Sequence, residues 1–310
     1  MLSRRNIRVK VMQTLYALDS IKDGMKPGEP ERMLIKKMDQ SRKLFTFLIY
    51  FITEVARYAE KDAARKAGKH LPTAKDLSVN TRISGNELVW KIVENESFEA
   101  AVESMGLSDM LDRELLRRVY SELVARPEYQ DYIELPSREK KSERKILEYI
   151  FNELMLPDEN FISHVEENFI NWDDDAEMMH ALVLNFLNKP VGTPFSEIIS
   201  GEKMDFAKKL LQTVLDKSEY TLELIKPKLK NWDAERIASL DLVLLQMGVC
   251  EFLYFETIPT RVTINEYIDL AKAYSTEQSG QFVNGLLDNI HKELTSQGKI
   301  EKRNYKNSTL

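Results

Sequence analysis

Apolar residues recur at helical spacing near the N-terminus, in the segment that follows Ser3. Intervals of four, four and three residues separate these positions, which predicts an amphipathic helix over residues 3–18 with Ser3 as its N-cap. The apolar positions are Ile7, Val11, Leu15 and Leu18.

The same periodicity predicts helices along the rest of the chain. No segment alternates apolar and polar residues between hairpin turns, so we expect an all-α protein without a sheet. Polar stretches over residues 60–86 and the proline-bracketed stretch 127–136 predict connectors, and Pro190, Gly192 and Pro194 mark the clearest boundary. The predicted helices span residues 31–60, 86–101, 108–125, 144–156, 173–188, 203–218, 219–231, 234–256 and 262–293, the last as two helices.

The composition favours helices but provides no overall charge that would attract nucleic acid. Of the 310 residues, 43% are hydrophobic and 30% are charged, with only 11 glycines and 10 prolines, which is enough for one or two buried cores. The formal net charge is −6, so any RNA site must be a local cluster of cations.

Cysteine usage and hydropathy indicate the cellular location of the protein. Cys250 is the single cysteine, so the chain forms no internal disulfide, which fits a reducing compartment. No apolar signal-peptide segment follows Arg4 and Arg5. The longest apolar stretch, around residues 44–55, is shorter than the roughly 20 residues that cross a bilayer. We therefore expect a soluble cytoplasmic protein with no membrane partner.

The sequence contains none of the common catalytic or cofactor-binding motifs, namely GxGxxG, the P-loop, HExxH and GxSxG. Cys250 lies among apolar neighbours, which predicts an inert buried thiol instead of a nucleophile. The histidines, which lack metal-ligand spacing, are His70, His164, His180 and His291. We expect a protein that is not an enzyme and that binds no cofactor or metal.

Cations crowd the first two turns of the predicted N-terminal helix. Arg4 and Arg8 lie four residues apart on one face, with Arg5 and Lys10 close by. Positive charge at a helix N-terminus opposes the helix dipole, at about 0.3–1 kcal/mol for each exposed residue. Two explanations fit this pattern equally well. The cations form either a solvated basic face or a phosphate-binding site. In the second case, counterion release on binding would offset the unfavourable interaction with the helix dipole.

Two polar segments near the C-terminus, residues 263–266 and 275–278, fit capping boxes at the starts of helices. The second of these helices carries Phe282 and Gly285. We interpret Gly285 as a position of close helix crossing. Phe282 is either a core residue or a stacking platform for an RNA base.

Segments at both ends of the chain closely resemble the NusB family. The N-terminal likeness is to the family's arginine-rich first helix, and the C-terminal likeness is to the family's signature. The segments are Arg4 to Tyr16, Asp241 to Glu251, residues 258–266 (IPTRVTINE), residues 270–272 (LAK) and residues 281–288 (QFVNGLLD). Together the resemblance covers about residues 3–18 and 203–293.

The resemblance implies a NusB-like fold of two packed three-helix bundles, here with an additional helical region. Members of the family bind single-stranded boxA RNA of nascent ribosomal RNA together with NusE, a ribosomal small-subunit protein. The complex joins RNA polymerase and suppresses termination. The implied function is therefore transcription antitermination, with boxA-type RNA, NusE and the RNA polymerase elongation complex as partners.

Positions that match the family's motifs give the expected site residues. The expected RNA-binding residues are Arg4, Arg5, Arg8, Gln278, Gln281 and Phe282, with Phe282 as the stacking ring. The residues expected to contact NusE are Tyr16 and Asp241. The residues expected to act structurally are Asn265, Glu266 and Asn284. Gln278 departs from the family, in which an acidic residue is common at that position.

Family members are typically much shorter than this chain. We expect the first core helix in residues 1–20, an additional and mostly helical insertion in 21–200, the remaining core in 201–295 and a basic flexible tail in 296–310. One further core helix comes either from the segment near 41–59 or from the one near 173–188, and the sequence does not choose between them.

Two other functions remain open at this point. One is a helical protein-interaction scaffold with no RNA binding of its own. The other is an accessory module of an RNA-modifying enzyme, because NusB-like domains also precede some ribosomal RNA cytosine methyltransferases. That function needs a cofactor-binding domain with a Gly-rich loop, and the sequence contains no such loop.

Overall fold

The computed structural model describes residues 2–19, 21, 26–190, 194–195, 198–231 and 238–303. Within these ranges the regular elements are all helices and no strand occurs, which confirms the predicted all-α class. None of the described helices is both long and apolar enough to cross a membrane. Gly192, at the centre of the predicted boundary, lies outside the described residues.

The chain forms two compact units, which are described separately. Unit 1 comprises Asp39–Ile199, and unit 2 comprises Leu2–Met38 together with Ser200–Leu310. The long helix α2 (Glu29–Ala67) therefore contributes residues 29–38 to unit 2 and the remainder to unit 1.

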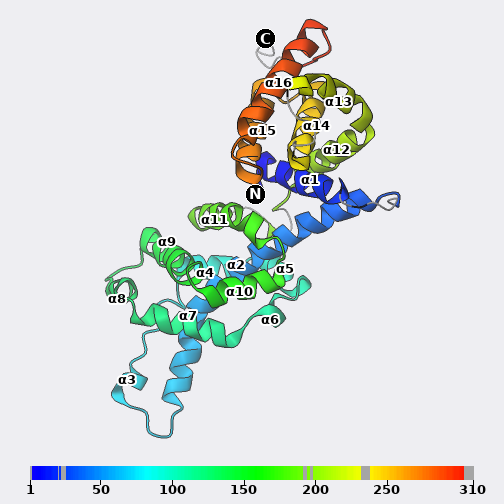
Figure 1. Cartoon of the computed structure of the whole chain (residues 1–310). Helices are drawn as coiled ribbons and strands as arrows, with labels where there is room; N and C mark the ends of the chain where they lie inside the picture. The colour runs from blue at the N-terminus through cyan, green and yellow to red at the C-terminus, as the bar shows by residue number, and fades with distance from the viewer. Residues whose placement is uncertain are drawn as a thin grey trace, which may run out of the picture. The chain divides into compact units, whose positions relative to one another are not determined.

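Unit 2 brings together helices from the two ends of the chain. Besides the start of α2, its helices are α1 (Arg4–Asp19), α12 (Gly201–Asp216), α13 (Ser218–Ile225), the 3-10 helix η3 (Lys226–Asn231), α14 (Ser239–Tyr254), α15 (Thr260–Tyr274) and α16 (Ser279–Ser296). The helices α14, α15 and α16 pack pairwise as a three-helix bundle, and α1, α12 and α13 pack against α14 (Figure 1). This arrangement agrees with the NusB-like fold that the resemblance implies.

The central position of α14 follows from its sequence, which is apolar on nearly every side, as expected of a helix enclosed by others. Gly248 lets α16 approach closely, because a Cβ there would lie 2.8 Å from Leu287 Cδ2. The predicted close crossing at Gly285 is wrong, since a Cβ at that position would meet no atom within 4 Å. The glycine that permits the close crossing of α14 and α16 is therefore Gly248 of α14 and not Gly285 of α16.

The predicted starts of three helices have different outcomes. Ser3 caps α1 as expected, because its Oγ accepts a hydrogen bond from the Asn6 N–H at 3.2 Å. The predicted capping box at Thr263 is wrong, since α15 begins at Thr260 and buries Thr263 inside the helix. The second predicted box is also wrong, because α16 begins only at Ser279, after the proposed box.

Part of the segment that we expected to form a flexible tail is bound to α14. Lys302 Nζ donates hydrogen bonds to the carbonyl oxygens of Glu251 and Phe255, each at 2.8 Å, at the C-terminal end of that helix. The Arg303 side chain binds Glu256 at 3.0 Å. Residues 304–310 lie outside the described ranges.

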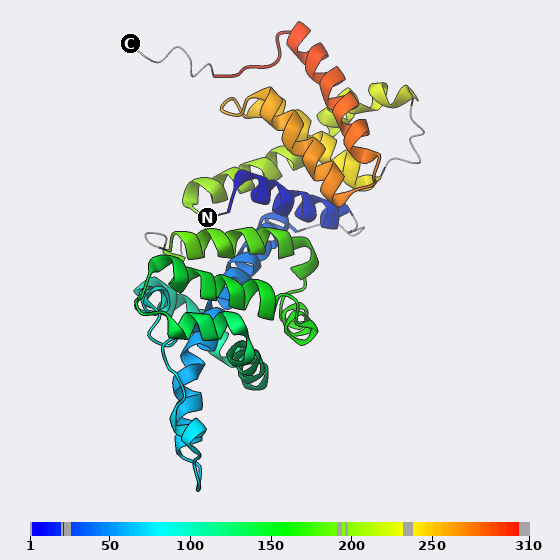
Figure 2. The ribbon, with the colours of Figure 1, turned by 90° about the vertical axis from the view of Figure 1, so that its left-hand side faces the viewer.

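Unit 1 is built around the remainder of α2. Its other helices are α3 (Ala74–Leu77), α4 (Glu87–Val93), α5 (Glu96–Ser104), α6 (Leu107–Met110), α7 (Arg113–Ala125), α8 (Pro127–Glu134), α9 (Lys140–Tyr149), the π-helix η1 (Ile150–Met155), α10 (Glu159–Asn168) and α11 (Trp172–Asn188). Phe47 and Phe51 of α2 are fully buried, and the ring of Phe51 meets that of Phe161 with centroids 4.9 Å apart. The end of α2 and α3 project from the rest of this unit (Figures 1 and 2).

Two stretches that we predicted as connectors contain helices. The helix α2 continues to Ala67, beyond the expected end near residue 60. Pro127 begins α8 instead of ending a helix, because proline at the first helical position lacks only an N–H that would have no intrahelical partner. The sequence also failed to predict α10, whose N-cap Asp158 accepts a hydrogen bond from the Asn160 N–H at 2.9 Å.

Candidate functional site

Arg8 lies in a buried polar cluster that joins α1 to α14 and α15. Its Nε and Nη2 bind Glu251 Oε1 and Oε2 at 2.6 and 3.1 Å, and the Arg8 side chain is only 2% exposed. Glu266 Oε2 lies 3.4 Å from Arg8 Nη1. The hydroxyls of Thr263 and Tyr267 donate hydrogen bonds to Glu251 at 3.1 and 2.8 Å. The buried carboxylate is thus fully occupied by donors.

This environment does not fit the expected contact between Arg8 and an RNA phosphate. Burial alone lowers the pKa of Arg8, but the hydrogen bond and the charge of Glu251 outweigh it and hold that pKa above its ordinary value. The guanidinium is charged, closed to solvent and already bound, so it holds α1 against the bundle instead of facing a ligand. Glu266 takes part in the same cluster, in the structural role that we expected for it.

Arg4 and Arg5, in contrast, remain at the surface of unit 2. Arg4 Nη2 lies 2.9 Å from Glu202 Oε1, and Arg5 Nη1 lies 3.1 Å from Asp269 Oδ2. Both arginine side chains are nearly half exposed, at 44% and 45%. Ion pairs of this kind contribute only about 0–1 kcal/mol, so an RNA phosphate can replace the carboxylate at little energetic cost.

The exposed face of α15 connects Arg5 to the start of α16. Asp269, the partner of Arg5, lies three residues before Lys272, so the two share one face of α15. A Cβ on Gly280 would lie 2.7 Å from Lys272 Cγ, which places the first turn of α16 directly against that lysine. Lys272 itself is exposed. Lys272 lies in one of the segments that resemble the family, but nothing in the sequence predicted that it belongs to a binding surface.

The first turn of α16 carries three residues that we expected to bind RNA. Gln278 and Gln281 are exposed, so their amide groups are open to a ligand. Phe282 is 5% exposed and packs within the unit, which does not fit a stacking platform. Of the two interpretations that the sequence left open, the structure agrees with a core residue. Asn284, expected to be structural, is instead exposed.

The two residues expected to contact NusE differ in their accessibility. Tyr16 is 45% exposed near the end of α1. Asp241 is 5% exposed, and its Oδ2 accepts a hydrogen bond from Ser279 Oγ at 2.7 Å, which links the starts of α14 and α16. A buried side chain does not fit the expected direct contact with NusE. Asp241 instead holds the start of α16 in place through Ser279.

The charge of the chain is unevenly divided between its two units. Unit 2 carries 24 lysines and arginines against 20 aspartates and glutamates, a formal charge of +4. Unit 1 carries 20 against 30, a formal charge of −10. Unit 2 is therefore basic although the whole chain is acidic. The exposed residues Arg4, Arg5, Lys272, Gln278 and Gln281 all belong to this basic unit.

The cysteine of unit 2 lies in the core of that unit. Cys250 is fully buried, and burial raises the pKa of its thiol to about 12, which confirms the predicted inert residue. In the part of the chain that the structure describes, no three metal-ligating side chains gather at one point.

Comparisons with known proteins agree with the fold. The NusB family model matches residues 173–292, from α11 to α16. The match includes the segment near 173–188, one of the two candidates for a further core helix, although contacts assign α11 to unit 1. No solved structure gives a significant match.

Relatives named transcription antitermination protein NusB are 40% identical to this chain. The protein of Salinibacter ruber aligns over 131 residues, which cover 42% of this chain and 76% of the relative. That of Finegoldia magna aligns over 94 residues, 30% and 69% of the two chains. That of Listeria monocytogenes serotype 4a aligns over 96 residues, 31% and 75%. The chain therefore belongs to the NusB family of transcription antitermination proteins.

Proposed function

We propose that unit 2 binds single-stranded boxA-type ribosomal RNA together with NusE and joins the RNA polymerase elongation complex in the cytoplasm. The observation that supports this proposal is the row of exposed polar and cationic side chains along α1, α15 and the start of α16. Its members are Arg4, Arg5, Lys272, Gln278 and Gln281.

The residues of this row suit different parts of an unpaired RNA strand. Arg4, Arg5 and Lys272 bind phosphates, and the release of counterions from the RNA favours the complex. The amides of Gln278 and Gln281 both donate and accept hydrogen bonds, as recognition of exposed base edges requires. Arg8 does not touch RNA in this scheme but fixes α1 through Glu251. Tyr16 supplies part of the NusE contact.

RNA binding by the full chain tests this proposal. We would measure the fluorescence anisotropy of a labelled boxA-type RNA, with and without NusE. Lys272→Ala and Gln281→Ala are each expected to weaken binding about threefold to tenfold, the effect of one lost polar contact. Lys292→Ala, on an exposed stretch of α16 where the lysine pairs with Asp288, is the control and should leave affinity unchanged. Equal losses of RNA affinity in all three variants would exclude a localised RNA-binding surface.

A protein-interaction scaffold without RNA binding is the second candidate. It is favoured by the carboxylate partners that all three N-terminal arginines have, Arg4 with Glu202, Arg5 with Asp269 and Arg8 with Glu251. In that case calorimetry would detect NusE binding that depends on Tyr16. Addition of boxA-type RNA would change neither its enthalpy nor its affinity.

A further inference from the structure

Unit 1 contains a groove that the function proposed for unit 2 does not use. It lies between α8, α9 and η1 and has a volume of about 560 Å³. Its floor is apolar and aromatic, formed by Tyr132, Leu135, Ile146 and Tyr149. Leu135 and Tyr149 are only partly buried in the isolated chain, so a ligand seated here would cover additional apolar surface.

Carboxylates surround this apolar floor. The rim carries Glu128, Asp131, Glu148 and Glu153 together with Lys145, and Glu148 pairs with Arg144 at 3.2 Å. Within the described part of the chain, Asp131 and Glu153 take part in no ion pair, and both are exposed. The rim therefore adds a local negative charge to a unit whose formal charge is already −10.

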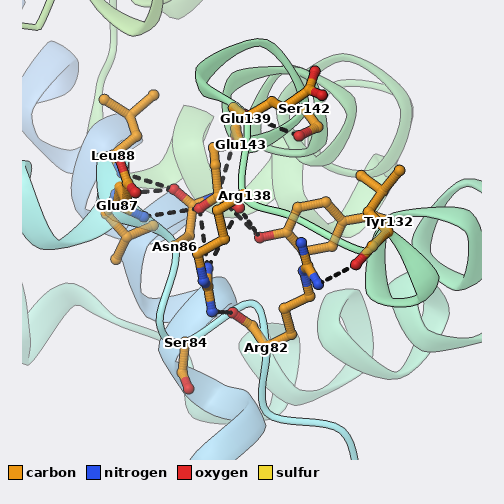
Figure 3. A network of polar contacts seen from close by, with 12 residues as sticks. Arg82, Ser84, Asn86, Glu87, Leu88, Tyr132, Arg138, Glu139, Ser142 and Glu143 are labelled. Carbon is orange, nitrogen blue, oxygen red and sulfur yellow. Dashed lines mark hydrogen bonds and ion pairs between the residues drawn. The ribbon is translucent and has the colours of Figure 1, made fainter.

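A buried hydrogen-bond network fixes the two walls of the groove (Figure 3). Glu143 of α9 is 1% exposed and accepts hydrogen bonds from the Tyr132 hydroxyl at 2.9 Å and from the Glu87 N–H at 2.8 Å. Arg138 adds an ion pair with Glu143 at 3.2 Å, and the Arg82 guanidinium donates to the carbonyl oxygen of Leu135. Tyr132 and Leu135 both face the groove, so a ligand would meet walls that are already in place.

The end wall of the groove has an unusual backbone. After α9 the chain winds as the π-helix η1, shown by the Leu156 N–H, which donates to Phe151 O at 3.1 Å across five residues. Asn152 and Glu153 of this segment line the groove. Such π-segments are rare and occur frequently at functional sites, which favours a binding role over simple packing.

We propose that this groove binds a cationic amphipathic helix of a protein partner. The apolar face of such a helix covers the floor, while its lysines or arginines meet the rim carboxylates, a known mode of helix recognition. The negative charge of unit 1 attracts a basic partner at long range and repels nucleic acid. This interaction is independent of the RNA surface proposed for unit 2.

A designed peptide tests the inference with the full chain. The probe is a dye-labelled helix of about 15 residues, since shorter helices are marginal in water, with leucines on one face and lysines on the other. We expect saturable binding detected by fluorescence anisotropy. A peptide of the same composition with scattered leucines should bind about tenfold more weakly. Equal binding of the two peptides would overturn the proposal.

Matched charge variants locate the site. The pair Asp131→Asn and Glu153→Gln should weaken peptide binding about fivefold, as expected for two lost ion pairs. The control pair Glu166→Gln and Glu167→Gln removes the same charge from exposed positions of α10 and should change affinity less than twofold. Equal losses of peptide affinity in the two double variants would show that the overall negative charge of unit 1 attracts the peptide. That result would overturn the assignment of the groove as the binding site. BoxA-type RNA binding should be the same in all these variants, so a failure here is distinct from a failure of the proposed function.

Discussion

The guanidinium of Arg8 and the carboxylate of Glu251 form a two-point ion pair that is closed to solvent, with side chains 2% and 0% exposed. The pair joins the first helix of the chain to the central helix of unit 2. Removal of one partner would leave the other as an unpaired buried charge, which is far less favourable than the pair itself. The arginine-rich N-terminus therefore has an inner member that supports the fold and outer members, Arg4 and Arg5, that face solvent.

Arg8→Met should destabilise unit 2 by about 3–5 kcal/mol, because it leaves Glu251 buried without its cation. Arg5→Met, which breaks an exposed pair, should change stability by about 0–1 kcal/mol. Denaturant unfolding followed by the reactivity of the Cys250 thiol measures both values. Adding Glu251→Leu to Arg8→Met should restore part of the loss, because it removes the buried charge but leaves the Thr263 and Tyr267 hydroxyls without their acceptor. A further loss would contradict this account.

The Cys250 thiol should be protected from disulfide reagents in the folded protein. Burial raises its pKa to about 12, above the ordinary value of 9, so the folded protein retains the proton that the unfolded chain loses. The contribution to stability is fully present below pH 9 and is lost as the pH rises towards 12. We expect one reactive thiol in denaturant and almost none in buffer at pH 8. Rapid reaction of the folded protein at pH 8 would place Cys250 at the surface.

How much the sequence could predict depended on whether a residue's role was local or long-range. Regular apolar spacing located α1 and α11, because packing on one face leaves a periodic signal. A nearly continuous apolar run located α14, which is enclosed on nearly every side. The roles of Arg4 and Arg8 could not be separated in this way. Glu251, the partner that buries Arg8, lies 243 positions away along the chain.

The candidate site was predictable in its segments but not in its individual residues. The resemblance selected the start of α16, yet it assigned an RNA contact to Phe282, which the structure buries. Lys272 emerged only from the approach of Gly280 to α15, a contact between two helices that no spacing along one helix encodes. Pro127 was misinterpreted because proline both ends and begins helices.

Two glycines of unit 2 should respond in opposite ways to substitution by alanine. Gly248→Ala places a Cβ 2.8 Å from Leu287 Cδ2 and 3.4 Å from Tyr267 Cδ2, so it should destabilise the protein by about 1–3 kcal/mol. Gly285→Ala meets no neighbouring atom in the middle of α16 and should stabilise it by about 0.5–1 kcal/mol. Unfolding midpoints of the two variants give the comparison, and a stabilising Gly248→Ala would show that α14 and α16 are less tightly packed.

The salt dependence of RNA binding should show directly whether Arg4 and Arg5 contact phosphates. Each phosphate contact adds about −0.7 to the slope of log affinity against log salt for single-stranded RNA. The double variant Arg4→Gln and Arg5→Gln should therefore reduce the magnitude of the slope by about 1.4. Lys292→Gln is the control and should leave it unchanged. An unaltered slope in the double variant would mean that these arginines keep their carboxylate partners in the complex.

Removal of unit 1 should leave a folded unit 2 only if the start of α2 is retained. Leu34 and Met38 are fully buried and do not belong to the core cluster of unit 1, and Glu31 pairs with Lys208 of α12 at 2.8 Å. A chain in which a short flexible linker replaces residues 39–199 should keep its helical circular dichroism and the protection of its thiol. Deletion of residues 21–200 also removes both apolar side chains, whose burial contributes about 1.5–3 kcal/mol each, and should be markedly less stable. Equal stability of the two deletions would show that the start of α2 is dispensable for unit 2.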